Sequence, residues 1–387
     1  MKEKAEVVQR NRLAKYTNVL NHYKKVEYIE ERAKFEGPGL IRAGEVSIEA
    51  KFIVIATGSS GAALQIPGIE MLERSDVLTN IEAFELETLP KSMIVIGGGP
   101  TGLEVAQIFH RFGSEVMVVQ RRNRLLPITE PEISDAIAKN LEAEGIKIQL
   151  NSQPVKVRKD GREIVLTVNM NGKEQELRAE KLFVAIGVRG NTEDLNLEAI
   201  GLRADGKGFI EVDEHMRTKA KNIYAAGDVT GAPWLETVAA REGAIAVASA
   251  FDAKPLSINY DAIPAAVFIE PQVAIAGITE EELMRRIGKC SCRTVPLSFV
   301  PKADITNQTN GVAKMVIHPD TKKIVGFHLV GPNAAEVIHE AALAIQHGLT
   351  IHDIINLVHV FPSYSEVIKI TAQAFTRDIQ NMSCCVE

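Results

Sequence analysis

The chain has 387 residues, of which 45% are hydrophobic, and this length and composition predict a globular protein of two or three domains. Its formal net charge of −6 and the absence of a long basic stripe exclude nucleic acid as an expected partner. The polar N-terminus has no apolar signal core, and no run of about 18 apolar residues follows, so we expect no membrane contact and a cytoplasmic location.

The first segments in chain order are a helix and a buried strand. Residues 1–20 are polar and helical in character. Residues 52–58 are an apolar strand that ends in Thr57 and Gly58, and residues 182–187 repeat this pattern and end in Gly187. Because the two strands flank a nucleotide-binding unit, we interpret them as a sign of two interleaved nucleotide-binding domains.

The unit between these strands has a strand, a glycine-rich turn, a helix and a second strand. Residues 93–96 are a buried strand, residues 103–109 place apolar side chains at helical spacing, and residues 115–119 begin the next strand. A GxGxxG motif alone is a weak signal, but a strand before it and a helix after it are the context that dinucleotide binding requires. The sequence therefore predicts a dinucleotide site here.

The three motif glycines have separate duties in such a site. Gly97 allows the tight turn, Gly99 lets the backbone approach the pyrophosphate, and Gly102 permits close packing of the helix on the strand. The N-terminus of the helix then faces the phosphates.

The residues after the second strand indicate which nucleotide binds. An NAD site places Asp or Glu there to hold the ribose 2′-hydroxyl, whereas this chain has Arg121 and Arg122, with Arg124 close behind. A guanidinium pairs well with a 2′-phosphate, and the missing carboxylate removes a repulsion, so we expect NADPH. The alternative is that these arginines only solvate a surface loop.

A further strand, residues 223–226, leads into Gly227 and Asp228. A carboxylate at the C-terminal edge of a strand can accept hydrogen bonds from a ligand hydroxyl. Taken alone, such an aspartate is more often a helix cap.

The C-terminal third carries mostly structural signals. Residues 280–287 and 334–346 are expected helices, and residues 312–330 an expected β-hairpin. Cys290 and Cys292 stand at alternate positions after the first helix, without a second CxxC, so we expect them to be structural rather than metal-binding or redox-active.

Two adjacent cysteines, Cys384 and Cys385, stand at the end of a chain that has four cysteines in all. Consecutive Cα atoms lie about 3.8 Å apart, shorter than the roughly 4.4–6.8 Å of a relaxed disulfide, so we expect the pair to work as thiols. Two soft sulfurs suit a thiophilic metal ion better than magnesium or calcium. The alternative is a frayed tail whose cysteines are incidental.

These segments together resemble the flavin-dependent pyridine nucleotide disulfide oxidoreductases, the family of lipoamide dehydrogenase, glutathione reductase and mercuric reductase. The resemblance covers nearly the whole chain and implies FAD and NADPH as cofactors. In the family pattern, Thr57 and Gly58 border the flavin, Asp228 binds the ribityl chain of FAD, and Glu104 corresponds to an acid near the nicotinamide. The cofactor-binding residues expected from motifs and resemblance are Thr57, Gly58, Gly97, Gly99, Gly102, Glu104, Arg121, Arg122, Gly187, Gly227 and Asp228.

The resemblance implies an α/β fold with two interleaved Rossmann-like domains, of which the FAD domain is incomplete, and an α+β C-terminal dimerisation domain. Residues 1–75 and 193–258 are expected in the FAD-binding domain, residues 76–192 in the NADPH-binding domain, and residues 259–387 in the dimerisation domain with its tail. A homodimer is therefore implied.

The C-terminus distinguishes members of the family. Lipoamide dehydrogenase and glutathione reductase carry a His-Pro pair, with a Glu five residues after the His, as an acid/base couple. Here Phe361 precedes the proline, so the position of the base holds a ring that cannot transfer a proton, although Glu366 remains. His359 is two residues early, which on an extended segment moves the imidazole by about 7 Å.

Mercuric reductases resemble the chain at this point and share the terminal vicinal cysteines. The resemblance implies two-electron reduction of Hg(II) to Hg(0), with Cys384 and Cys385 as catalytic and metal-binding residues that collect the ion and pass it inward. Glu366 is a further catalytic candidate and Tyr364 a further metal-binding candidate. In the family the tail reaches the active site of the other subunit.

One departure from the family pattern opens two alternatives. The family's N-terminal GxGxxG for FAD and its CxxxxC redox pair have no counterpart in the sequence, so we expect this chain alone to bind FAD poorly and to turn over slowly or not at all. One alternative is a truncated, non-catalytic NADPH-binding dimer that only binds mercury. The other is a lipoamide-dehydrogenase-like disulfide reductase, which Phe361 and Arg121 disfavour.

Overall fold

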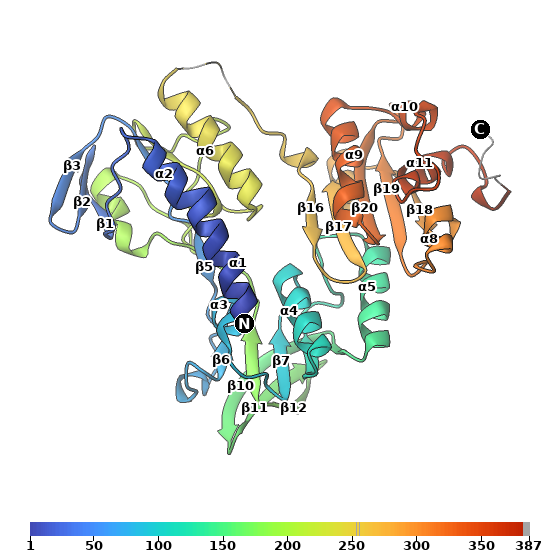
Figure 1. The fold of residues 1–387 in the computed structure, drawn as a ribbon, viewed down its shortest axis with the longest axis horizontal. Helices are drawn as coiled ribbons and strands as arrows, with labels where there is room; N and C mark the ends of the chain where they lie inside the picture. The colour runs from blue at the N-terminus through green and yellow to red at the C-terminus, as the bar shows by residue number, and fades with distance from the viewer. Residues whose placement is uncertain (253, 255, 382–387) are drawn as a thin grey trace. The chain divides into compact units, whose positions relative to one another are not determined.

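The computed structural model describes residues 1–252, 254 and 256–381, which fold as two units (Figure 1). Unit 1 consists of Met1–Ser60, Phe84–Thr88 and Val188–Ile258. Unit 2 consists of Gly61–Ala83, Leu89–Gly187 and the chain from Asn259 onward. The segments of the two units alternate along the chain. The predicted α/β fold class with a C-terminal α+β part is confirmed. The predicted domain boundaries stay a prediction.

Unit 1 combines a long N-terminal helical stretch, a three-stranded antiparallel meander and a short parallel strand pair with one covering helix. Its main elements are α1 (Lys2–Arg12), a π-helical turn (Leu13–Thr17), α2 (Asn18–His22), β1 (Ala33–Gly37), β2 (Leu40–Ala43), β3 (Val46–Glu49), β4 (Ile53–Ile55), β5 (Ser59–Gly61), β14 (Val188–Gly190), β15 (Ile223–Ala225) and α6 (Glu236–Ala250). The meander has the order β1-β2-β3, β4 pairs in parallel with β15, and β5 pairs with β14.

The strand β4 shows the period of a half-buried strand. Ile53 and Ile55 are buried in a core with Phe35 and Ile223, whereas Val54 between them is exposed. The side chains of a strand alternate between its two faces, so β4 turns one face to this core and one away from it. Ile245 of α6 is buried against Tyr224 of β15, which closes the other side of β15. Because β4 and β15 run parallel, their carboxyl ends lie side by side.

Unit 2 begins with a parallel sheet of order β6-β13-β7-β8-β9. Its elements are β6 (Val77–Leu78), α3 (Asn80–Glu85), β7 (Ser92–Ile96), α4 (Pro100–Arg111), β8 (Glu115–Val119), α5 (Pro131–Glu144), β9 (Lys147–Gln149) and β13 (Lys181–Val184), with an antiparallel hairpin sheet of β10 (Ser152–Asp160), β11 (Glu163–Met170) and β12 (Lys173–Ala179). After their first residues, the central strands β7, β8 and β13 are wholly apolar, as expected of parallel strands covered on both faces. The predicted strand–helix–strand unit is β7, α4 and β8.

The C-terminal part of unit 2 is an antiparallel sheet of order β16-β17-β20-β19-β18. Its elements are β16 (Ala265–Val267), β17 (Gln272–Gly277), α7 (Glu280–Ile287), β18 (Ser291–Pro296), α8 (Pro301–Ile305), β19 (Val312–Ile317), β20 (Ile324–Gly331), α9 (Ala334–His347), α10 (Ile351–Asn356) and α11 (Glu366–Gln373). The expected helix 280–287 and the expected hairpin are both present.

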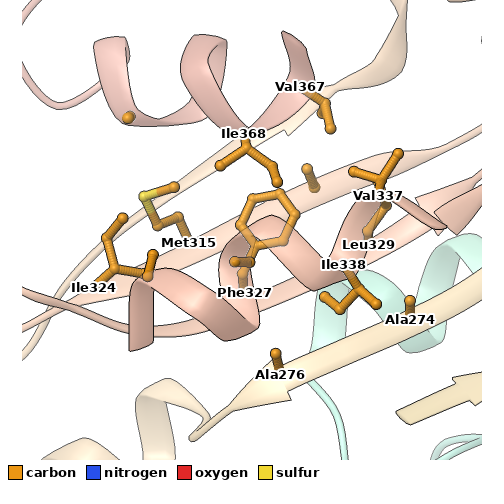
Figure 2. Packing of buried hydrophobic residues seen from close by; sticks show 14 of the residues in the cluster. Ala274, Ala276, Met315, Ile324, Phe327, Leu329, Val337, Ile338, Val367 and Ile368 are labelled. Atoms are coloured by element: carbon orange, nitrogen blue, oxygen red, sulfur yellow. The ribbon is translucent and has the colours of Figure 1, made fainter. Parts of the chain in front are cut away.

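The two faces of this C-terminal sheet differ in character. On one face, Phe327 and Met315 pack against Ile338 of α9 and Ile368 of α11 in an apolar core (Figure 2). The other face contacts α5, and there the buried side chains of β19 and β20 include charged and polar ones. Side-chain alternation along each strand produces this division. No helix within the described residues is both long enough and apolar enough to cross a membrane.

Candidate functional site

The glycine-rich turn after β7 has the geometry that its motif predicts. Gly97 has a φ of +114°, a conformation that favours glycine, and a Cβ there would overlap the carbonyl of Ala185. A Cβ at Gly102 would overlap the carbonyl oxygen of Gly97. A Cβ at Gly99, in contrast, would meet no heavy atom within 4 Å. Gly97 and Gly102 are therefore required by packing, whereas Gly99 leaves the backbone open to approach.

The N-terminus of α4 lies directly behind this turn. Gly99 is the N-cap residue and Pro100 the first residue of the helix, and no side chain caps the exposed amides. Uncapped N–H groups at the start of a twelve-residue helix favour an anion, because they need acceptors and carry the positive end of the helix dipole. The turn and the helix start thus fit the pyrophosphate of a dinucleotide.

The arginines after β8 are placed differently from one another. Arg121 and Arg122 are exposed, and within the described part of the chain neither side chain forms a hydrogen bond or an ion pair. Arg124 is partly buried, and its guanidinium lies 3.7 Å from a carboxylate oxygen of Glu281. The first two cations are therefore available to a ligand phosphate, whereas the third already has a partner.

Glu104 and Gln107 connect α4 to the segment between β16 and β17, and Gln107 was not predicted from the sequence. Glu104 accepts a hydrogen bond of 2.8 Å from the backbone N–H of Phe268. Gln107 is buried and pairs twice with the backbone of Glu270, accepting at 2.7 Å and donating at 2.8 Å. A polar Gln on the apolar face of an amphipathic helix was the available signal for this contact. One oxygen of Glu104 is thus used in fixing the helix.

The predicted flavin residues of unit 1 meet at the carboxyl ends of β4 and β15. The hydroxyl of Ser59 donates a hydrogen bond of 2.7 Å to the carboxylate of Asp228. Gly58 has a φ of +70°, and Gly227 a φ of +77°. Asp228 begins a short 3-10 turn whose N-cap is Gly227, and no side chain caps that turn, so the helix-cap alternative for Asp228 is wrong.

Two further contacts fix this junction. The buried carboxylate of Glu242, on α6, accepts a hydrogen bond of 2.7 Å from the backbone N–H of Gly227. Thr57 is exposed, and its carbonyl accepts a hydrogen bond from the side chain of Asn191 at 2.9 Å. Gly187 belongs to unit 2 instead, where it follows β13 with a φ of +112°. Neither Ser59 nor Glu242 was predicted from the sequence, because no motif marks them.

The segment before α11 contains the residues that distinguish the family members. The imidazole Nε2 of His359 lies 2.9 Å from a carboxylate oxygen of Glu340, and this hydrogen bond raises the pKa of His359. Phe361 is half exposed. Glu366 accepts a hydrogen bond of 2.9 Å from the backbone N–H of Ser363. His359 and Glu366 are therefore engaged with different partners and form no acid/base couple with each other.

Tyr364, the predicted metal-binding tyrosine, is held by the loop after α8. Its hydroxyl lies 2.7 Å from the side-chain oxygen of Gln308 and 2.6 Å from the hydroxyl of Thr306. Cys384 and Cys385 lie outside the described residues. Within the described residues, no three or more His, Cys, Asp or Glu side chains are arranged around a common position for a metal ion.

Two family models match the chain. The model described as pyridine nucleotide-disulphide oxidoreductase matches residues 1–243, and the model of the dimerisation domain of the same enzymes matches residues 263–372.

Mercuric reductases and a dihydrolipoamide dehydrogenase are similar to the chain over 90% or more of its length. The chain is 35% identical over 385 residues to the mercuric reductase of Bacillus cereus, and over 383 residues to that of Staphylococcus aureus. It is also 35% identical over 357 residues, 90% of its length, to a dihydrolipoamide dehydrogenase of Chaetomium thermophilum. The chain spans 60%, 69% and 70% of these relatives, respectively.

A solved structure has the same fold. The HOCl-induced flavoprotein disulfide reductase of Escherichia coli matches with a TM-score of 0.86 and 26% identity. The match covers 96% of this chain and 84% of the bacterial enzyme.

Proposed function

Because the chain belongs to the pyridine nucleotide-disulphide oxidoreductase family, we propose that it catalyses the NADPH- and FAD-dependent reduction of Hg(II) to Hg(0). In this proposal, Cys384 and Cys385 deliver the ion. One observation carries the choice of mercury over a disulfide. Phe361 stands where disulfide reductases of the family place their base, and the nearby His359 is paired with Glu340 rather than with Glu366. Reduction of a disulfide needs a proton donor for the departing thiolate, whereas reduction of a metal ion does not.

The nucleotide would be held by the turn after β7 and by the cations after β8. Gly99 leaves room for the pyrophosphate, the amides of α4 face it, and Arg121 and Arg122 have no other described partner. Two guanidinium groups favour the 2′-phosphate of NADPH over the 2′-hydroxyl of NADH. When bound, NADPH would supply the two electrons of the reduction as a hydride, and FAD would accept them and pass them on.

The flavin would rest on the junction of β4 and β15. Asp228 has an acceptor oxygen to offer to a ligand hydroxyl, and Ser59 fixes the orientation of that carboxylate. The positive φ angles of Gly58 and Gly227 let the backbone pass close to a ligand without a Cβ. Glu104 would lie by the nicotinamide, where its hydrogen bond to Phe268 holds α4 in place.

The terminal thiols would act as a relay. Two adjacent thiolates bind Hg(II), and they release it by exchange with other thiols because side chains of neighbouring residues do not readily converge on one linear ion. The match to the dimerisation domain supports a homodimer, in which the tail of one protomer would serve the other.

A second candidate is a dimer that binds NADPH and mercury without reducing the metal. This candidate concerns the 387 residues themselves, which contain no CxxxxC pair, and unit 1, whose parallel sheet has only β4 and β15 within the described residues. Two parallel strands are a small platform for a flavin.

The test compares electron acceptors on the purified chain. With FAD added, flavin retention is measured by absorbance, and NADPH oxidation is followed with Hg(II) held by excess monothiol, with lipoamide and with glutathione disulfide. The purified chain is expected to turn over slowly, and we expect the oxidation that it does catalyse to depend on Hg(II) and to exceed the rate with either disulfide. The Cys384→Ser/Cys385→Ser variant should lose the mercury that the tail binds, so that it holds less Hg(II) per chain than the unaltered protein, and should keep NADPH binding.

Two results would decide against this proposal. Oxidation of NADPH with a disulfide and none with mercury would favour the disulfide reductase. Binding of NADPH and mercury without turnover, in the presence of retained flavin, would favour the non-catalytic dimer.

A further inference from the structure

Cys290 and Cys292 both contact the carboxylate of Glu280, and in the sequence they are well separated from Cys384 and Cys385. The Sγ of Cys290 lies 3.1 Å from Oε1 of Glu280, and the Sγ of Cys292 lies 3.2 Å from Oε2 of the same side chain. Both cysteines are half-buried, so small solutes can reach them. The two thiols are therefore held on one side of the chain by a shared acceptor.

The backbone explains why the two thiols converge. Cys290 directly precedes β18, an edge strand of the C-terminal sheet, and Cys292 is its second residue. Residues two apart on an extended chain point to the same face, with Cα atoms roughly 6.6–6.8 Å apart. Adjacent cysteines on such a chain would point to opposite faces. The spacing of Cys290 and Cys292 thus suits two ligands on opposite sides of one ion.

We propose that Cys290 and Cys292 form a second thiol site, which binds one soft, two-coordinate metal ion of the Hg(II) type. From the sequence alone, these cysteines were expected to be structural. Zinc does not fit, because it takes four ligands, and no third ligand is arranged around a common ion position within the described chain. Magnesium and calcium do not fit either, because they require oxygen ligands.

The charges beside the site favour a divalent ion over a monovalent one. Lys314 lies within 3.0 Å of carboxylates of Glu130, Glu132 and Glu280, so this cluster of one ammonium and three carboxylates has a net charge of −2. Two thiolates with Hg(II) form a neutral complex, which adds no charge to the cluster. Two thiolates with Cu(I) would add a further negative charge to a half-buried site that is already negative.

Binding requires ligand exchange and no oxidant. Mercury held by two solution thiolates exchanges both of them for the sulfurs of Cys290 and Cys292. Each cysteine S–H bond breaks, each proton goes to a departing solution thiolate, and each departing thiol leaves neutral. Mercury remains Hg(II) throughout. Glu280, which accepts from both S–H groups, keeps the two sulfurs facing the same side.

The site goes beyond the proposed reduction and does not depend on it. The chain has four cysteines, so the Cys384→Ser/Cys385→Ser variant retains only Cys290 and Cys292. Mercury binding to this variant is measured by equilibrium dialysis of Hg(II) against excess 2-mercaptoethanol, without flavin or NADPH. A failure of the reductase assay therefore leaves this measurement unaffected.

We expect the Cys384→Ser/Cys385→Ser variant, the two-cysteine variant, to bind one Hg(II) per chain. Adding Cys290→Ser or Cys292→Ser should weaken binding roughly 100-fold, because the second sulfur then comes from solution instead of from the same chain. Ser291→Ala is the matched control and should bind as the two-cysteine variant does. Thermal unfolding of each variant verifies that it is folded.

A second measurement uses the unaltered protein. Maleimide labelling followed by peptide mass spectrometry should show that Hg(II) protects Cys290 and Cys292 together. Protection of one cysteine without the other, or one ion per two chains in the dialysis experiment, would overturn the proposal. So would a single-cysteine variant that binds Hg(II) as tightly as the two-cysteine variant does.

Discussion

Lys314 of β19 and His328 of β20 are register partners on the face of the C-terminal sheet that contacts α5, and both are buried. Burial opposes the charge of Lys314, but hydrogen bonds to Glu280, Glu132 and Glu130 more than offset it, so the pKa of Lys314 is raised. His328 has a hydrogen bond to the hydroxyl of Thr129, and burial lowers its pKa to about 4. One of the two neighbours is therefore charged at neutral pH and the other is neutral.

Replacing Lys314 by Met should strongly destabilise unit 2. Glu130 is also buried, and it would keep a negative charge with no cation beside it. Loss of one partner of a buried ion pair costs about 3–5 kcal/mol of the free energy of unfolding. Urea unfolding of Lys314→Met measures this loss, and the exposed Lys173→Met serves as control, with an expected change below about 0.5 kcal/mol. Equal effects of the two substitutions would contradict this account of Lys314.

The stability of the protein should fall as the pH drops from about 6.5 toward 4. The unfolded chain protonates His328 near pH 6.5, whereas the folded chain resists protonation until about pH 4. Stability that is present above pH 6.5 is therefore lost on acidification, by roughly 3 kcal/mol in total. The paired His359 has a raised pKa, so its contribution is fully present below pH 6.5 and does not enter this window. Chemical denaturation at half-unit pH steps, on the natural chain and on His328→Gln, should show a slope that the variant lacks.

Sequence patterns predicted the parts of the fold whose signal is local. The helix Glu280–Ile287 and the unit of β7, α4 and β8 were foreseen, because amphipathic periodicity and a glycine turn are written in consecutive residues. The contacts of Asp228 with Ser59 and of His359 with Glu340 were not foreseen. Each joins residues far apart in the chain, and a polar residue gives no sign of its partner until the fold brings the two together.

The glycines of the turn after β7 should respond differently to the same added methyl group. Gly99→Ala should leave the unfolding temperature unchanged, because the added Cβ has open space and the φ of −86° suits alanine. It should nevertheless weaken NADPH binding, because the methyl group occupies the path of the pyrophosphate. Gly102→Ala should lower the unfolding temperature, because its Cβ overlaps the carbonyl oxygen of Gly97. Thermal scans and NADPH titrations of both variants separate the two effects, and equal unfolding temperatures would refute the packing argument for Gly102.

The preference for NADPH should depend on Arg121 and Arg122. The double change Arg121→Ala/Arg122→Ala should weaken NADPH binding by about 1.5–3 kcal/mol for each charge-assisted hydrogen bond lost, and leave NADH binding nearly unchanged. Arg162→Ala, at an exposed residue in the turn between β10 and β11, is the control for loss of a surface cation. Isothermal titration with each nucleotide gives the four affinities. A parallel loss for both nucleotides would mean that the arginines do not contact the 2′-phosphate.

Flavin binding should be more sensitive to Asp228 than to Ser59. Asp228→Ala removes the acceptor proposed for the ligand hydroxyl, and we expect FAD affinity to fall by about 1–3 kcal/mol, which is roughly 5-fold to 150-fold. Ser59→Ala leaves the carboxylate in place and removes only the 2.7 Å hydrogen bond that orients it, so its effect should be smaller. Asp194→Ala, at an exposed ion pair with Arg32, is the matched control in the same unit. Titration of FAD fluorescence gives the order of affinities. Equal affinities of the Asp228 and Asp194 variants would remove Asp228 from the flavin site, and a larger loss in Ser59→Ala would assign the ligand contact to the hydroxyl.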